Sequence, residues 1–85
     1  MTPNAKRAAD AIAELDLLIN SARAISRKTA LQLERLKSRT ENDLRVGGFI
    51  DLEEIRRNID NVIEDNRVMA IVANKTWIAY ARDLA

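Results

Sequence analysis

The clearest periodic pattern of apolar residues lies in the second half of the chain. Residues recur there at alternating steps of three and four, which is the spacing of a buried helix face: Leu52, Ile55, Ile59, Val62, Asn66, Met69, Ala73, Thr76 and Tyr80. Asp51 precedes the series as a helix N-cap, and Glu54 completes a capping box with it. The pattern predicts one long helix over about 51–84, in which a buried Asn66 fixes the register against a partner helix.

The first half of the chain carries a similar apolar stripe. Residues 5–25 contain no helix breaker, and the stripe continues through Leu33, Leu36 and Leu44. Between these parts, the Ser, Thr and Asn side chains of residues 20–29 compete for backbone hydrogen bonds, which weakens a helix. We therefore favour one helix over about 4–45, with a three-helix chain broken near residues 20–29 as the alternative.

Residues 46–50 form the expected turn, because Gly47 and Gly48 suit the left-handed end of a helix. The sequence thus predicts an all-α fold, in which a single domain over 1–85 is an antiparallel hairpin of two long helices. After Arg67 the second helix is apolar on several faces, which one partner helix cannot cover. We expect dimerisation into a four-helix bundle, or binding of another protein, through six apolar residues outside the main seam: Leu17, Leu31, Val68, Ile71, Val72 and Ile78.

Composition narrows the possible chemistry. The chain has no cysteine and no histidine, so disulfides, thiolate chemistry and the commonest metal ligand are excluded. No phosphate-binding loop or nucleophile motif occurs, so we predict no catalytic residue, cofactor or metal site. No apolar run reaches membrane-spanning length and no signal-peptide core is present, so a cytoplasmic location is expected.

Charge gives one further candidate surface. The net charge of +1 argues neither for nor against a nucleic-acid partner. Four basic residues near the turn are candidate contacts for an anion or an acidic partner: Arg35, Lys37, Arg39 and Arg45. Because acidic residues such as Glu34 and Glu41 are interleaved with them, a solvated surface is favoured over a nucleic-acid site.

One family resemblance bears on function. Ile12, Leu15, Asp16, Leu18 and Arg23, with the run from Val62 to Asp65, resemble the all-helical chorismate mutases, which are intertwined dimers. Alanines replace the arginine that this family places before the Leu–Asp pair, and no lysine fits the middle segment, so we assign no family. The favoured function is a non-enzymatic module that binds itself and another protein, as a regulator, adaptor, chaperone or inhibitor. A nucleic-acid-associated regulator is the alternative, and a chorismate-mutase-like enzyme comes third.

Overall fold

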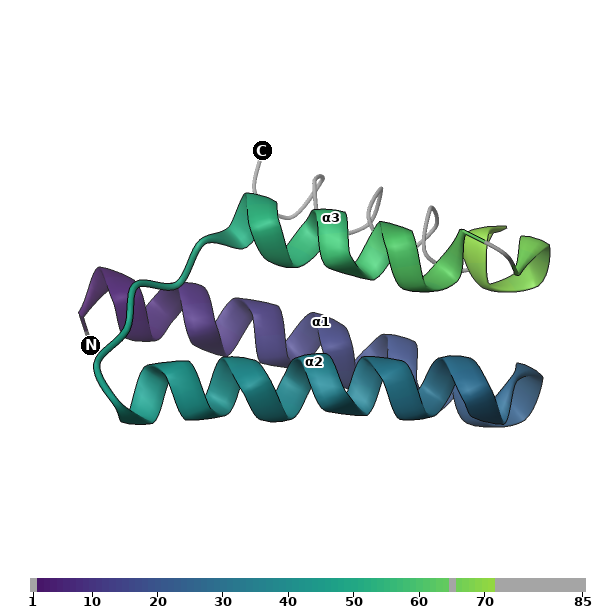
Figure 1. Ribbon diagram of the computed structural model, residues 1–85, viewed down its shortest axis with the longest axis horizontal. Helices are drawn as coiled ribbons and strands as arrows, with labels where there is room; N and C mark the ends of the chain where they lie inside the picture. Colours follow the sequence, from purple (N-terminus) through teal and green to yellow (C-terminus); the bar gives the residue numbers. More distant parts are fainter. Residues whose placement is uncertain (1, 65, 72–85) are drawn as a thin grey trace.

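The computed structural model describes residues 2–64 and 66–71, and three long helices make up most of this part of the chain. Helix α1 spans Pro3–Ile25, α2 spans Arg27–Arg45 and α3 spans Leu52–Ile63, and residues 67–71 are helical as well. Helices α1 and α2 lie side by side and run in opposite directions, and α3 packs along one side of the pair (Figure 1). The predicted all-α class and the hairpin of long helices are confirmed.

The turn of this hairpin lies at Ser26. Its backbone is extended, with φ −152° and ψ 109°. Its N–H donates to the Ala22 carbonyl at 2.7 Å, which ends α1, and its hydroxyl accepts from the Thr29 N–H at 3.3 Å, which begins α2. An uninterrupted helix over 4–45 is therefore not formed. The break near residues 20–29, given above as the alternative, is observed, because one serine serves as the cap of both helices.

Helices α1 and α3 each begin at a side-chain cap, and the cap of α3 is the predicted Asp51. The Thr2 hydroxyl accepts a hydrogen bond from the Ala5 N–H at 3.1 Å. One Asp51 carboxylate oxygen accepts from the backbone N–H groups of Glu53 and Glu54, at 3.0 and 3.3 Å. Each cap satisfies N–H groups that have no carbonyl partner within the first helical turn. Local sequence thus determines where α1 and α3 begin.

The end of α2 follows a known glycine motif. Gly47 has φ +78°, a left-handed backbone conformation that residues with a Cβ atom rarely adopt. The Gly48 N–H donates to the Asp43 carbonyl at 2.8 Å, and the Gly47 N–H donates to the Leu44 carbonyl at 3.1 Å. This pair of bonds is the Schellman motif. The predicted turn at 46–50 is therefore present, but it connects α2 to α3 and is not the turn of the α1·α2 hairpin.

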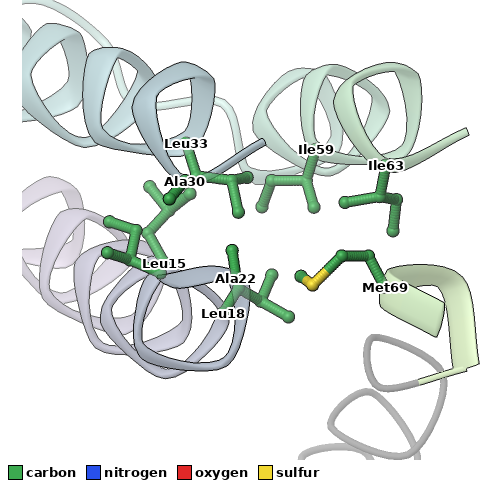
Figure 2. Packing of buried hydrophobic residues seen from close by; sticks show 9 residues of the cluster. Leu15, Leu18, Ala22, Ala30, Leu33, Ile59, Ile63 and Met69 are labelled. Atoms are coloured by element: carbon green, nitrogen blue, oxygen red, sulfur yellow. The ribbon is translucent and has the colours of Figure 1, made fainter. Parts of the chain in front are cut away.

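The core lies where the three helices and residues 67–71 meet. Figure 2 shows side chains from all four segments pointing toward one another. The buried cluster consists of Leu15, Leu18, Ile19, Ala22, Ala30, Leu33, Ile59, Ile63 and Met69. On each long helix these positions recur every three or four residues, as the sequence pattern predicts. Burial of this apolar surface is the main force that holds α3 on the hairpin.

Asn66 differs from its predicted role. Helix α3 ends at Ile63, and the Asn66 side chain accepts a hydrogen bond from the Met69 N–H at 3.1 Å. Asn66 is thus the N-cap of the helical residues 67–71, because asparagine favours that position over a helix interior. The predicted continuous helix over 51–84 is interrupted here, and its residues 72–84 lie outside the described part of the chain.

Candidate functional site

Of the six predicted apolar interface residues, the four that the structure describes come from three different helical segments. Leu17 is 59 % exposed and lies two positions from both Leu15 and Ile19, so it points away from the buried stripe of α1. Leu31 is about half exposed on α2. Val68 and Ile71 are exposed on the helical residues 67–71, where Met69 is the buried side chain. Val72 and Ile78 lie outside the described residues.

Two ion pairs join α1 to α2. The Asp16 carboxylate lies 2.7 Å from the Lys37 ammonium, and the Glu34 carboxylate lies 3.0 Å from the Arg23 guanidinium. The hydrogen bond that the Lys37 ammonium donates to the Asp16 carboxylate is the main reason that the pKa of Lys37 is raised above its ordinary value. Both pairs are solvent-accessible, so they contribute little to the stability of the protein and mainly align the two helices.

Helical geometry places these ion pairs on the side of the hairpin away from α3. Glu14 and Asp16 are two residues apart on α1, so their side chains point in nearly opposite directions around the helix. Glu14 lies near Arg56 and Asp60 of α3, whereas Asp16 pairs with Lys37 of α2. The edge of α1·α2 marked by the Asp16–Lys37 pair therefore faces away from α3, and we call it the open seam.

Two shallow grooves follow the open seam. The first is lined by Ile12, Lys37, Glu41, Leu44 and Arg45, and the second is lined by Arg23, Arg27, Ala30, Leu31 and Glu34. Each groove combines apolar side chains with charges of both signs. The open seam thus brings together one predicted apolar contact, Leu31, and two predicted basic contacts, Lys37 and Arg45.

The other two predicted basic residues lie elsewhere on α2. Arg35 is exposed. Arg39 lines a small cavity of about 40 Å³ between α2 and α3, together with Asp43 and Asp51. A cavity of that size holds water molecules and excludes a metabolite. The four basic residues therefore do not form a single patch on the surface.

Glu14 is the feature that the sequence analysis did not single out as a site. It is 7 % exposed, and its Oε1 atom has no hydrogen-bond partner. Burial raises the pKa of Glu14 from 4.5 to about 7; the Arg56 guanidinium lowers this pKa and the Asp60 carboxylate raises it. The spacing of Glu14 from the buried Ala11 and Leu18, three and four residues away, is the signal that could have placed it in the core.

A second feature that was not predicted is a set of contacts between the start of α1 and the loop that joins α2 to α3. The Asn4 side chain donates to the Gly48 carbonyl and accepts from the Ile50 N–H, both at 2.8 Å. Arg7 donates to the Ile50 carbonyl at 3.0 Å, and its guanidinium lies 4.9 Å from the centroid of the exposed Phe49 ring. These contacts span more than forty residues of sequence, so no local pattern indicates them.

No group of three or more His, Cys, Asp or Glu side chains within residues 2–64 and 66–71 could hold a metal ion. Among the same residues, no helix combines the length and the apolar character needed to cross a bilayer.

No protein-family model matches the sequence, and neither a curated protein nor a solved structure matches it significantly.

Proposed function

We propose that the protein is a non-enzymatic helical interaction module that binds an amphipathic helix of another protein along the open seam. In this role it acts as a regulator, adaptor, chaperone or inhibitor of that protein. Association with a second copy through the same seam is the simplest form of this activity, and it would bring helices α1 and α2 of two copies together as a four-helix bundle.

The observation that carries the proposal is the pair of grooves along the open seam. Ile12, Leu31 and Leu44 supply apolar contacts there, with the buried Ala30 beneath. Charged side chains border them at intervals of about one helical turn. An apolar strip with charged edges is what an amphipathic helix needs to dock in a groove. The bordering charges set the register of such a complex more than its affinity.

The same charges argue against the nucleic-acid alternative. Glu34 and Glu41 line the grooves beside the basic residues, and Lys37 is already paired with Asp16. Phosphate binding depends on a concentration of unpaired positive charge. A mixed-charge seam therefore favours a protein partner.

The test uses Leu31→Glu, with Leu17→Glu as a matched control. Both leucines are exposed and helical, but only Leu31 lines the open seam. Light scattering gives the solution mass of each variant, and immobilised protein retains partners from cell extract. We expect wild type and Leu17→Glu to associate with the same partner and Leu31→Glu to lose it, with unchanged helical circular dichroism. Equal association of all three proteins would contradict the proposal.

A further inference from the structure

The interface between α1 and α3 contains a carboxyl group that is poorly placed for its ionised form. Glu14 is buried, with 7 % of its surface exposed, and its Oε1 atom has no hydrogen-bond partner. A buried carboxylate is stable only when hydrogen bonds or opposite charges replace its hydration. The protonated acid carries no charge, so it fits this site far better.

The charged groups that act on Glu14 come from α3. Arg56 favours the carboxylate, while Asp60 opposes it. Burial outweighs the Arg56 contribution. On α1, Asp10 lies one helical turn earlier, and Arg7 is engaged with the Ile50 carbonyl. Among the described residues, α2 adds no charge that affects this carboxyl group.

Helix α3 is the element that can respond to a charge at Glu14. Only two of its residues, Ile59 and Ile63, are buried, whereas seven residues of α1 are buried. Helices α1 and α2 are joined directly through Ser26, but α3 is connected to α2 through the turn and loop after Arg45. Outward movement of α3 would return Glu14 to water without opening the α1·α2 hairpin.

We propose that Glu14 is a pH-sensitive latch: its neutral form keeps α3 packed on the α1·α2 hairpin, and its ionisation releases α3. Release uncovers the apolar side chains of Ile59, Ile63 and Leu33, which meet in the core (Figure 2). The latch lies on the side of α1 away from the open seam, so it holds whether or not the seam binds a partner.

The test is amide hydrogen exchange followed by NMR between about pH 5 and about pH 8, corrected for the intrinsic exchange rate. Protection of α3 amides, such as those of Ile59 and Ile63, is compared with that of Leu18 and Leu33. A pKa near 7 in the packed state and 4.5 in the released state implies that α3 opening increases on the order of a hundredfold over this range. Amides of α1 and α2 should keep their protection.

Three variants make the result specific. Glu14→Gln stays neutral and should abolish the pH dependence of α3 protection. Glu53→Gln removes an exposed carboxylate from α3 and serves as the matched control, so it should behave as wild type. Asp60→Asn removes the charge that opposes ionisation and so lowers the pKa of Glu14 in the packed state; the loss of protection should therefore level off at lower pH and be smaller.

Either of two results would overturn the proposal. One is a pH-dependent loss of α3 protection that persists in Glu14→Gln or is unmoved in Asp60→Asn. The other is a wild-type protein in which α3 keeps its protection to pH 8, or in which all three helices lose it together. The exposed position of Asp60 means that Asp60→Asn folds even if Glu14→Gln does not.

Discussion

Two acidic residues on the same helix, Glu14 and Asp16, have opposite environments. Asp16 is partly exposed on the open seam and lies 2.7 Å from the Lys37 ammonium. Glu14 points the other way, toward α3, where it is buried with one oxygen that has no hydrogen-bond partner. The side of α1 on which a carboxylate lies thus decides whether it is solvated and paired or excluded from water.

This difference separates two kinds of interface in one small protein. The open seam aligns α1 and α2 with ion pairs at its edge and leaves grooves beside them. The α3 side contains the apolar core together with a titratable group, Glu14, whose ionised form opposes burial. We expect changes on the α3 side to affect folding and pH response, and changes on the open seam to affect association.

The largest effect is expected where α1 meets the other helices in the core. Leu18 is fully buried, so Leu18→Ala removes packing contacts and leaves a cavity, at a cost of roughly 3 to 4 kcal/mol in the free energy of unfolding. Leu17→Ala, one position along on the exposed side, should change it by less than about 0.5 kcal/mol. Urea unfolding of both variants measures the contrast. Similar losses of unfolding free energy in the two variants would mean that Leu17 and Leu18 are not on an exposed and a buried side of α1.

The next effect sharpens the comparison at Glu14 itself. Because the folded pKa is raised to about 7, the unfolded chain releases the Glu14 proton first, and stability falls as pH rises from about 4.5 to about 7. The loss is complete above about pH 7 and amounts to at most about 3 kcal/mol, at 1.36 kcal/mol per pKa unit. Glu14→Gln should therefore be more stable than wild type at about pH 8 and nearly equal to it at about pH 4. Urea unfolding at both values checks this, and a variant less stable at pH 8 would contradict the sign.

A smaller effect is expected at the loop that α1 holds. Asn4→Ala removes two hydrogen bonds to the backbone of Gly48 and Ile50 and leaves the part-buried Ile50 N–H without its acceptor. The expected loss is about 1 to 2 kcal/mol in the free energy of unfolding. Thermal unfolding measures it, with Thr2→Ala, a helix-cap change at the same end, as the comparison. A stability equal to wild type would mean that the loop is held by other contacts.

The smallest effect on stability is expected at Asp16, on the open seam. Asp16→Asn breaks a solvent-exposed ion pair, so its effect on stability should be slight and should disappear at high salt. Unfolding curves at low and high salt test this, with Asp10→Asn as the control. A large, salt-independent loss would show that the open seam depends on this pair for its packing.

The parts of the fold that could be predicted from sequence depend on local chemistry. Asp51 and Thr2 are caps because their side-chain oxygens reach N–H groups two or three residues away. Gly47 ends α2 because it adopts a positive φ with little strain. The three- and four-residue spacing of apolar residues gives the buried face of each helix. None of these signals requires knowledge of the tertiary structure.

The parts that were wrong depend on choices that local signals leave balanced. A serine such as Ser26 can either continue a helix or cap one, and local sequence does not decide between the two. Packing of α1 against α2 favours the cap. Asn66 has the spacing of a core residue, but its side chain caps residues 67–71 instead. With the turn moved from 46–50 to Ser26, the basic residues of α2 point to different sides of the hairpin.

Of the candidate site, sequence identified Leu31, Lys37 and Arg45 but not the surface they share. The open seam exists only because α1 folds back on α2, which brings Ile12 beside Leu44. The sequence neighbours of Glu14 do not reveal that Arg56 and Asp60 of α3 lie near it. Contacts between distant segments decide both features.

The measurement that tests this account most directly is the titration of the Glu14 carboxyl carbon by NMR in the intact protein. We predict a midpoint near pH 7, because burial disfavours the ionised carboxylate. The titration should be accompanied by chemical-shift changes in α3 near Arg56 and Asp60. A midpoint near the ordinary value of 4.5 would mean that Glu14 is solvated in solution, and that the contrast between the two sides of α1 is wrong.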